Sequence, residues 1–361
     1  MKLLGLFLVL AGLASGGWSA GAGADQLPRL VVRGHFFALE TGERFSGIET
    51  SDFHLLGRFL GHEPIEAILE QRRSVGFNML RVWTRYDLEK AGIGRLRLSE
   101  HPDLYARLPA FLGLAARHGF YVNLTAYTGP YTEGFDPGHW TRLCEAARGS
   151  PNVILSLVNE LDQRANEMDP SKFSRCPGVL SSRGSNGSQA PTVTPPWDWG
   201  EYHINSAPDW PSKVGHASME LAVAHNVPVH ATENTRFPDN DSSLEHAYDA
   251  ARGSALLNAA ATFHSVHGKS AQLFEGVELE AAKAWVAGAK SISLSCQDEV
   301  YRRRIDLVHA RVPARQHLSL PRPNSPVGGL LHQHLKPTIC MSVAQSHRRE
   351  IDADHSVAPR G

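Results

Sequence analysis

The chain of 361 residues is long enough for two average domains or for one large barrel, and a hydrophobic content of 42% is ordinary for a soluble globular protein. Its 36 basic and 37 acidic residues give a net charge of -1. Such a balance excludes a global field that would attract nucleic acid or an anionic membrane surface, so neither is expected as a partner.

The first 24 residues are expected to be a secretory signal peptide. "MKLLGLFLVLAGLASGG" has one lysine, a short apolar run and then small residues, and "AGA" at residues 22–24 fits a peptidase site. An uncleaved anchor is the alternative, although the run is short for a membrane span. We therefore expect a secreted or periplasmic protein that is free of the membrane after cleavage.

The expected export bears on the redox state of the four cysteines. In an oxidising compartment they can pair, and the favoured bridge joins Cys144 to Cys176. Four cysteines are too few for a disulfide framework in a chain of this length, so free buried thiols are the alternative.

Strands and helices are expected to alternate along the chain after an N-terminal hairpin at 29–44 with a turn at Thr41-Gly42. Short apolar runs predict strands at 45–50, 76–83, 120–127, 152–159, 179–185, 198–205, 227–233 and 258–265. Apolar residues at helical spacing predict helices at 63–75, 103–118, 137–149, 163–173 (shortened), 211–226, 242–257 and 276–290.

Eight strand–helix steps over about 250 residues are typical of a closed (β/α)8 TIM barrel. An open doubly wound sheet is the rival fold, but it would want a G-x-G-x-x-G turn, which the sequence lacks. The barrel is therefore expected over residues 25–290. Residues 291–361 become rich in Arg, Pro, His and Ser without periodicity, and they predict an irregular, largely disordered C-terminal extension.

The stretch "NVILSLVNEL" runs an apolar strand straight into Asn159 and Glu160. Active sites of such barrels lie at the C-terminal ends of the strands, so this strand delivers both polar groups to the mouth of the pocket. Three strands later, "VPVHATEN" sets Glu233 in the same way. Barrel closure is expected to bring the two carboxylates across one pocket. Glycosidic cleavage needs such a pair, at about 5 Å for retention and about 7–9 Å for inversion.

The motifs "VNE" (158–160) and "ATEN" (231–234) resemble the retaining (β/α)8 glycoside hydrolases of clan A, the cellulase- and mannanase-like superfamily. The resemblance covers roughly residues 28–290. It implies Glu160 as acid/base, Glu233 as nucleophile, and Asn159 as a hydrogen-bonding partner of the sugar 2-hydroxyl. It needs no cofactor and no metal.

Further positions follow from the same resemblance. "FNMLRVW" is similar to the second strand of the group, which implies that Arg81 braces the nucleophile. "EYHIN" is similar to the sixth strand and offers Tyr202 and His203, of which only one can point inward. The eighth strand, "ATFHS", lacks the sugar-stacking Trp of many relatives, and His264 takes its place.

Five aromatic residues could stack on sugar rings, and ordinary packing is expected to claim at least half of them. They are Trp83, Tyr127, Trp197, Trp199 and Trp210.

Other chemistries find less support. The histidine pairs at 264/267 and 332/334 lack a second cluster that would complete a metal site, and no G-x-S-x-G elbow is present. The sequence thus predicts an exported retaining β-glycosidase that cleaves an oligo- or polysaccharide with β linkages by double displacement. The alternative is a catalytically silent barrel that binds carbohydrate or a protein partner, which the missing eighth-strand Trp favours.

Overall fold

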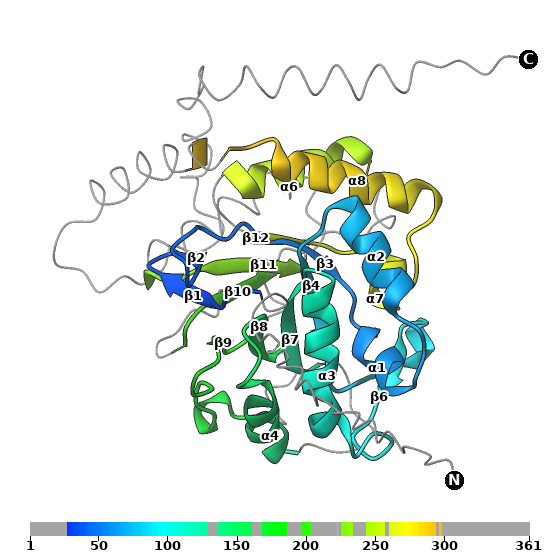
Figure 1. Ribbon diagram of the computed structural model, residues 1–361, viewed down its shortest axis with the longest axis vertical. Coiled ribbons are helices and arrows are strands. Elements are labelled where there is room, and N and C mark those ends of the chain that lie inside the picture. The colour runs from blue at the N-terminus through cyan, green and yellow to red at the C-terminus, as the bar shows by residue number, and fades with distance from the viewer. Residues whose placement is uncertain are drawn as a thin grey trace, which may run out of the picture.

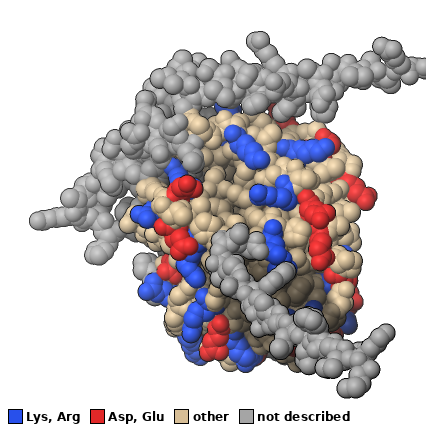
Figure 2. Space-filling model, in the orientation of Figure 1, with Lys and Arg blue, Asp and Glu red and all other residues tan. Residues whose placement is uncertain are grey.

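The computed structural model describes residues 27–128, 136–160, 168–185, 197–203, 222, 225–233, 243–256, 260–293 and 296–297. The expected signal peptide, Trp210, most of the expected helix at 211–226 and the C-terminal extension beyond residue 297 lie outside them. No helix among the described residues is long and apolar enough to cross a membrane. On the face shown in Figure 2, basic and acidic side chains are interspersed, in keeping with the near-zero net charge.

Eight parallel strands form the central sheet, in the order β10-β11-β12-β3-β4-β7-β8-β9 (Figure 1). They are β3 (Ile48–Ser51), β4 (Met79–Trp83), β7 (Tyr121–Tyr127), β8 (Val153–Val158), β9 (Ser181–Ser182), β10 (Gly200–His203), β11 (Val229–Glu233) and β12 (Ala260–Phe263). A parallel bridge pairs Ser182 with Trp199, directly before β10, and joins the two edges of the sheet. The predicted (β/α)8 barrel is confirmed.

An antiparallel hairpin of β1 (Leu30–Arg33) and β2 (Phe36–Leu39) precedes the barrel. Besides the predicted turn at Thr41-Gly42, the chain also reverses at Gly34, between β1 and β2, where φ is a left-handed 60°. Thr41-Gly42 forms a second turn, which returns Arg44 to pair with Ala38.

The hairpin closes the N-terminal end of the barrel with an apolar floor. The floor consists of Leu30, Phe37, Met79, Tyr121, Ile154 and Trp199. The rings of Phe37 and Trp199 meet edge to face at 6.0 Å. Burial of apolar surface thus joins the hairpin to the first residues of the barrel strands.

Helices cover the outside of the barrel (Figure 1). They are α1 (Leu55–Leu60), α2 (Glu66–Val75), α3 (Leu104–Arg117), α4 (Gly138–Ala147), α6 (Leu244–Leu256), α7 (Val266–Lys269) and α8 (Gly276–Lys290), with short 3-10 turns at η1 (Glu89–Ala91) and η3 (Pro170–Lys172). A small hairpin of β5 (Tyr86–Leu88) and β6 (Gly94–Leu96) follows β4. The bounds of α8 are those predicted.

The helix predicted over 63–75 starts later than expected, and a separate helix, α1, precedes it. Gly61 ends α1 and Pro64 stands before α2. A glycine and a proline so close together interrupt a single helix. At its other end, α2 stops at Gly76, whose left-handed φ of 112° is a common helix terminus.

A disulfide joins Cys144 of α4 to Cys176 before β9, with the Cα atoms 5.4 Å apart. The favoured pairing is therefore confirmed. The 32-residue separation between the two cysteines contains β8 and the Asn159-Glu160 pair, so the bridge holds both ends of the segment that carries the predicted acid/base.

Candidate active site

Polar side chains, all of them buried, line the strands of this barrel. Side chains alternate along a strand, so Leu80 and Val82 enter the apolar core beneath the helices while Arg81 takes the other face. The buried polar residues of the strands include Glu49, Arg81, Asn123, Ser156, Glu201, His203, His230, Thr232 and Thr262. Buried polar groups are costly unless they are paired, and here many of them are paired with one another.

Arg81 is the centre of this polar interior. Its Nη2 donates to Asn159 Oδ1 at 2.6 Å, and its Nη1 donates to the carbonyl oxygen of Thr232 at 3.0 Å. Asn159 precedes Glu160, and Thr232 precedes Glu233. One guanidinium therefore ties the ends of β8 and β11 together across the barrel, at the positions where both predicted carboxylates are attached.

Glu160 stands at a strained backbone position directly beyond β8. Its φ is 56°, which is unusual for a residue other than glycine, and its backbone N–H donates to Ser185 Oγ at 3.3 Å. Its side chain is 20% exposed, whereas its neighbours in the site are buried. Strain of this kind tends to collect at functional sites.

The chain after β9 supports the end of β8 by very close contact. Gly184 has a φ of 104°, and a Cβ at this position would lie 1.9 Å from the carbonyl oxygen of Val158. Ser185 N–H donates to the same oxygen at 3.0 Å. Only glycine permits this approach, which sets the place where Asn159 and Glu160 leave the barrel.

Of the two candidates on the sixth barrel strand, His203 is the residue that joins the site. It is buried, its Nε2 lies 3.0 Å from Thr232 Oγ1, and its Nδ1 lies 3.8 Å from Glu160 Oε1. Tyr202 is half-buried and packs against the apolar groups outside the barrel, among them Val229.

A β-bulge changes the register at the end of β11. Tyr202 pairs with Ala231 but His203 pairs with Glu233, so Thr232 is the extra residue. Bulges of this kind are frequent next to active sites, where they re-aim the chain. The backbone of Glu233 thereby lies opposite that of His203, and its side chain lies outside the described part of the structure.

Sequence analysis overlooked two buried carboxyl groups in this interior. Burial raises the pKa of Glu201, although the nearby charge of Arg81 opposes the shift. Burial also raises the pKa of Glu49 to about 8. Thr262 donates its hydroxyl to Glu49 Oε2, and His230 Nε2 lies 3.2 Å from the same oxygen. The pKa of His230 is lowered to about 3 by burial and by Arg81, so the pair is neutral near pH 7.

A signal for these residues exists in the sequence. Glu201 and His203 stand two positions apart in "GEYH", as do His230 and Thr232 in "VHATE". Residues two apart on a strand share a face, so these two polar pairs indicate a polar barrel interior.

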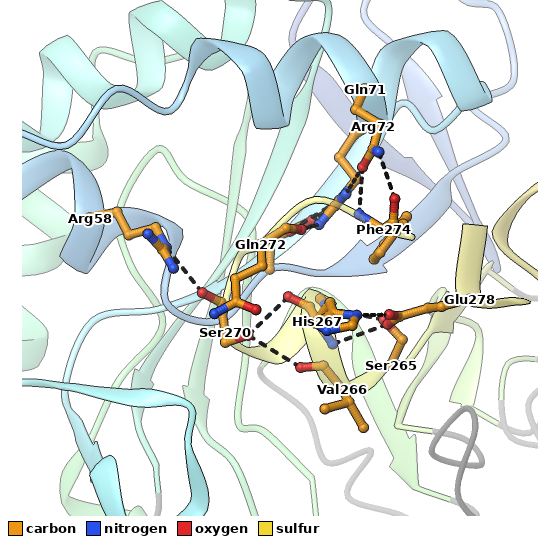
Figure 3. A network of polar contacts seen from close by, with 12 residues as sticks. Arg58, Gln71, Arg72, Ser265, Val266, His267, Ser270, Gln272, Phe274 and Glu278 are labelled. Carbon is orange, nitrogen blue, oxygen red and sulfur yellow. Dashed lines mark hydrogen bonds and ion pairs between the residues drawn. The ribbon is translucent and has the colours of Figure 1, made fainter. Parts of the chain in front are cut away.

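His264 lies at the end of β12, where its Nδ1 is 2.8 Å from Ser51 Oγ. It is buried, and its ring meets that of Phe53 at 5.4 Å. The segment that follows it is fastened to α1 and α2 by the polar network in Figure 3. Arg72 Nη2 donates to Gln272 O at 2.5 Å, and Gln71 exchanges two hydrogen bonds with the backbone of Phe274.

The same network contains a buried ion pair at the end of β3. Arg72 Nη2 lies 2.9 Å from Asp52 Oδ1, both side chains are fully buried, and the guanidinium sits over the Phe274 ring at 3.4 Å. Arg58 Nε donates to Ser270 O at 3.1 Å on the opposite side. The segment at 270–274, which follows His264 in the chain, is therefore held by residues of both α1 and α2.

The aromatic candidates are mostly packing residues. Trp83 stacks on Phe53 at 3.6 Å and is buried. Tyr127 is buried and donates its hydroxyl to Asp136 O at 2.7 Å. Trp197 packs edge to face on Trp140, and Trp199 belongs to the apolar floor.

No group of three or more His, Cys, Asp or Glu side chains that could hold a metal ion occurs among the described residues. No protein-family model and no curated protein matches the sequence.

Solved structures do match the fold. One, described as a glycoside hydrolase, is 14% identical and covers 78% of this chain and 75% of its own, with a TM-score of 0.51. A glycoside hydrolase family 5 structure from Bacteroides vulgatus is 14% identical and covers 70% of this chain and 65% of its own, with a TM-score of 0.50. The chain has the fold of these glycoside hydrolases. A β-1,4-D-mannanase from Cryptopygus antarcticus also matches, at 12% identity, 68% and 94% coverage and a TM-score of 0.46.

Proposed function

We propose that the chain is an exported retaining β-glycosidase that hydrolyses the O-glycosidic bonds of an oligo- or polysaccharide through Glu160 and Glu233. The observation that carries the proposal is the double contact of Arg81 with Asn159 and with the backbone of Thr232. It supports a single pocket over which the residues after both contacts can act on one sugar. The cystine between α4 and the chain before β9 supports export, because such bridges persist in oxidising compartments.

In the first step, Glu160 donates its proton to the glycosidic oxygen as the bond from that oxygen to the anomeric carbon breaks. The carboxylate of Glu233 forms the new bond to the anomeric carbon, and the leaving group departs as an alcohol. Asn159 holds the sugar 2-hydroxyl. His264 occupies the place where a sugar-stacking Trp would stand.

In the second step, Glu160, now a carboxylate, takes a proton from water while the water oxygen attacks the anomeric carbon. The bond to Glu233 breaks, and the sugar is released with its original anomeric configuration. Each glutamate thus returns to its starting state.

The test uses Glu160→Gln and Glu233→Gln on a panel of aryl β-glycosides, with the anomer of the first product read by NMR. Glu160→Gln is expected to lower kcat/KM on the order of 10²–10⁴-fold, and Glu233→Gln to abolish turnover. Glu66→Gln, an exposed position on α2, is the matched control and is expected to act like wild type. Wild-type turnover in either site variant, or an inverted first product, refutes the double displacement. Glycan binding without hydrolysis by the wild-type chain supports the silent barrel instead.

A further inference from the structure

A row of three buried polar side chains runs behind Glu160. His203 Nε2 lies 3.0 Å from Thr232 Oγ1, and Thr232 Oγ1 donates to Glu201 Oε2 at 3.2 Å. The other ring nitrogen of His203, Nδ1, lies 3.8 Å from Glu160 Oε1. The row therefore leads from a carboxyl group deep in the barrel to the carboxyl group at its mouth.

The threonine in the middle has one proton, and this limits the arrangements of the row. While Thr232 donates to Glu201, it can only accept from His203, so Nε2 carries the ring proton. A neutral histidine then presents the lone pair of Nδ1 to Glu160. The opposite arrangement, with a proton on Nδ1, requires Thr232 to turn its hydrogen toward Nε2 and away from Glu201.

Charged groups from the neighbouring strands act on the row. Arg81 of β4 brings Nη2 to 3.9 Å from Glu201 Oε2, and its charge opposes the rise in the pKa of Glu201 that burial causes. Burial raises the pKa of Glu49 of β3 to about 8, with a smaller contribution from Glu201, so Glu49 is protonated near pH 7. Glu160 itself faces His203 from the end of β8, and Glu233 follows Thr232 on β11.

We propose that Glu201 and Thr232 are positioning residues that keep the proton of His203 on Nε2, so that the lone pair of Nδ1, and not an N–H group, faces Glu160. The inference deepens the proposed function and rests on it for the role of Glu160. Neither residue touches the sugar. They act through His203, and Thr232 donates to Glu201, the terminal acceptor of the row.

The decisive variant is Thr232→Val, which keeps the shape of the side chain and removes the hydroxyl. In Thr232→Val the N–H at Nε2 of His203 has lost its hydrogen-bond acceptor, so the ring is expected to carry its proton on Nδ1 instead. The Nδ1–H group then faces Glu160 and stabilises its carboxylate. The basic limb of the pH profile of kcat/KM is expected to move down by about one pH unit. Thr232→Ser restores the hydroxyl and is expected to restore the wild-type limb. Glu201→Gln is expected to move the limb in the same direction by less.

A second readout does not depend on catalysis. In chain labelled with 15N-histidine, the ring signals of His203 are assigned by their loss in His203→Gln. Wild type and Thr232→Ser are expected to show a protonated Nε2 and a bare Nδ1, and Thr232→Val the reverse. Far-UV circular dichroism verifies that each variant folds.

The two readouts separate the possible failures. An unchanged tautomer in folded Thr232→Val overturns the positioning role, whatever the activity. A wild-type chain with the expected tautomer and no glycosidase activity refutes the proposed function and leaves the hydrogen-bonded row intact. An altered tautomer with an unmoved pH profile refutes the link from His203 to Glu160.

Discussion

The two ends of this barrel differ in polarity. At the N-terminal end, the hairpin and the first residues of the strands form an apolar floor in which Phe37 meets Trp199. At the C-terminal end, Arg81 of β4 contacts polar groups of β10, of β11 and of the residue after β8, and Glu160 stands in a strained conformation. In TIM barrels generally, stability and chemistry are separated along the barrel axis in this way. Substitutions at either end should therefore have distinct signatures.

The largest effect is expected from Arg81→Met, which removes the only guanidinium contact that joins the ends of β8 and β11 among the described residues. Glu201 is left buried without its ion-pair partner, which costs about 3–5 kcal/mol of unfolding free energy. Displaced strand ends are expected to lower kcat/KM by about 10²-fold or more. Urea denaturation and the aryl glycoside assay measure the two losses.

Arg81→Lys serves as the companion variant. It keeps the charge beside Glu201 but cannot donate to Asn159 and to the Thr232 carbonyl in the same forked geometry. It is expected to recover much of the stability and little of the activity. Full activity in Arg81→Lys would show that the fork does not organise the site.

Phe37→Ala tests the contribution of the apolar floor to stability. Removing this ring from its contact with Trp199 is expected to lower the unfolding free energy by about 3 kcal/mol. Because the floor lies at the far end of the strands, kcat/KM of the folded variant is expected to match wild type. Phe37→Leu, which leaves a smaller void, is expected to cost less. A loss of activity at temperatures where Phe37→Ala is folded would contradict the separation of the two ends.

The smallest effect concerns Glu49, whose pKa is raised from 4.5 to about 8 in the folded chain. The folded chain holds a proton there that the unfolded chain releases above about pH 4.5. The stabilisation from this site is complete below that pH and is lost as the pH rises through 8. Between pH 7 and pH 8 it is expected to remove about 1 kcal/mol of unfolding free energy.

Glu49→Gln cannot ionise, so its stability is expected to fall less over the same interval. The pH window avoids His230, whose pKa is lowered to about 3 and whose effect on stability appears only as the pH falls below about 6.5. Glu66→Gln on the surface of α2 is the control. Equal slopes for wild type and Glu49→Gln in urea denaturation would mean that Glu49 ionises freely.

Much of the fold was predictable, because strand and helix periodicities are local properties of the chain. The apolar run at 153–158 and the helix at 276–290 follow directly from their residues. The helix α1 and the hairpin β5–β6 did not follow, since they are short and owe their form to packing against the barrel.

The site divides in the same way. Asn159 and Glu160 follow an apolar strand that the sequence marks clearly, and Arg81 donates to Asn159 in the structure. The choice between Tyr202 and His203, and the bulge at Thr232, depend on how β10 and β11 pair. Pairing register is a relation between two distant segments, and no pattern within either strand specifies a bulge.

The close approach of Gly184 to β8 has a practical consequence for anyone who wishes to redirect this protein. The loop after β9 is a natural stretch to randomise when a new ligand preference is sought. Even alanine at position 184 would collide with the Val158 carbonyl and displace the backbone that leads into Glu160. Library members altered at position 184 are therefore expected to lose activity because the backbone near Glu160 is displaced, and such a loss would carry no information about ligand preference.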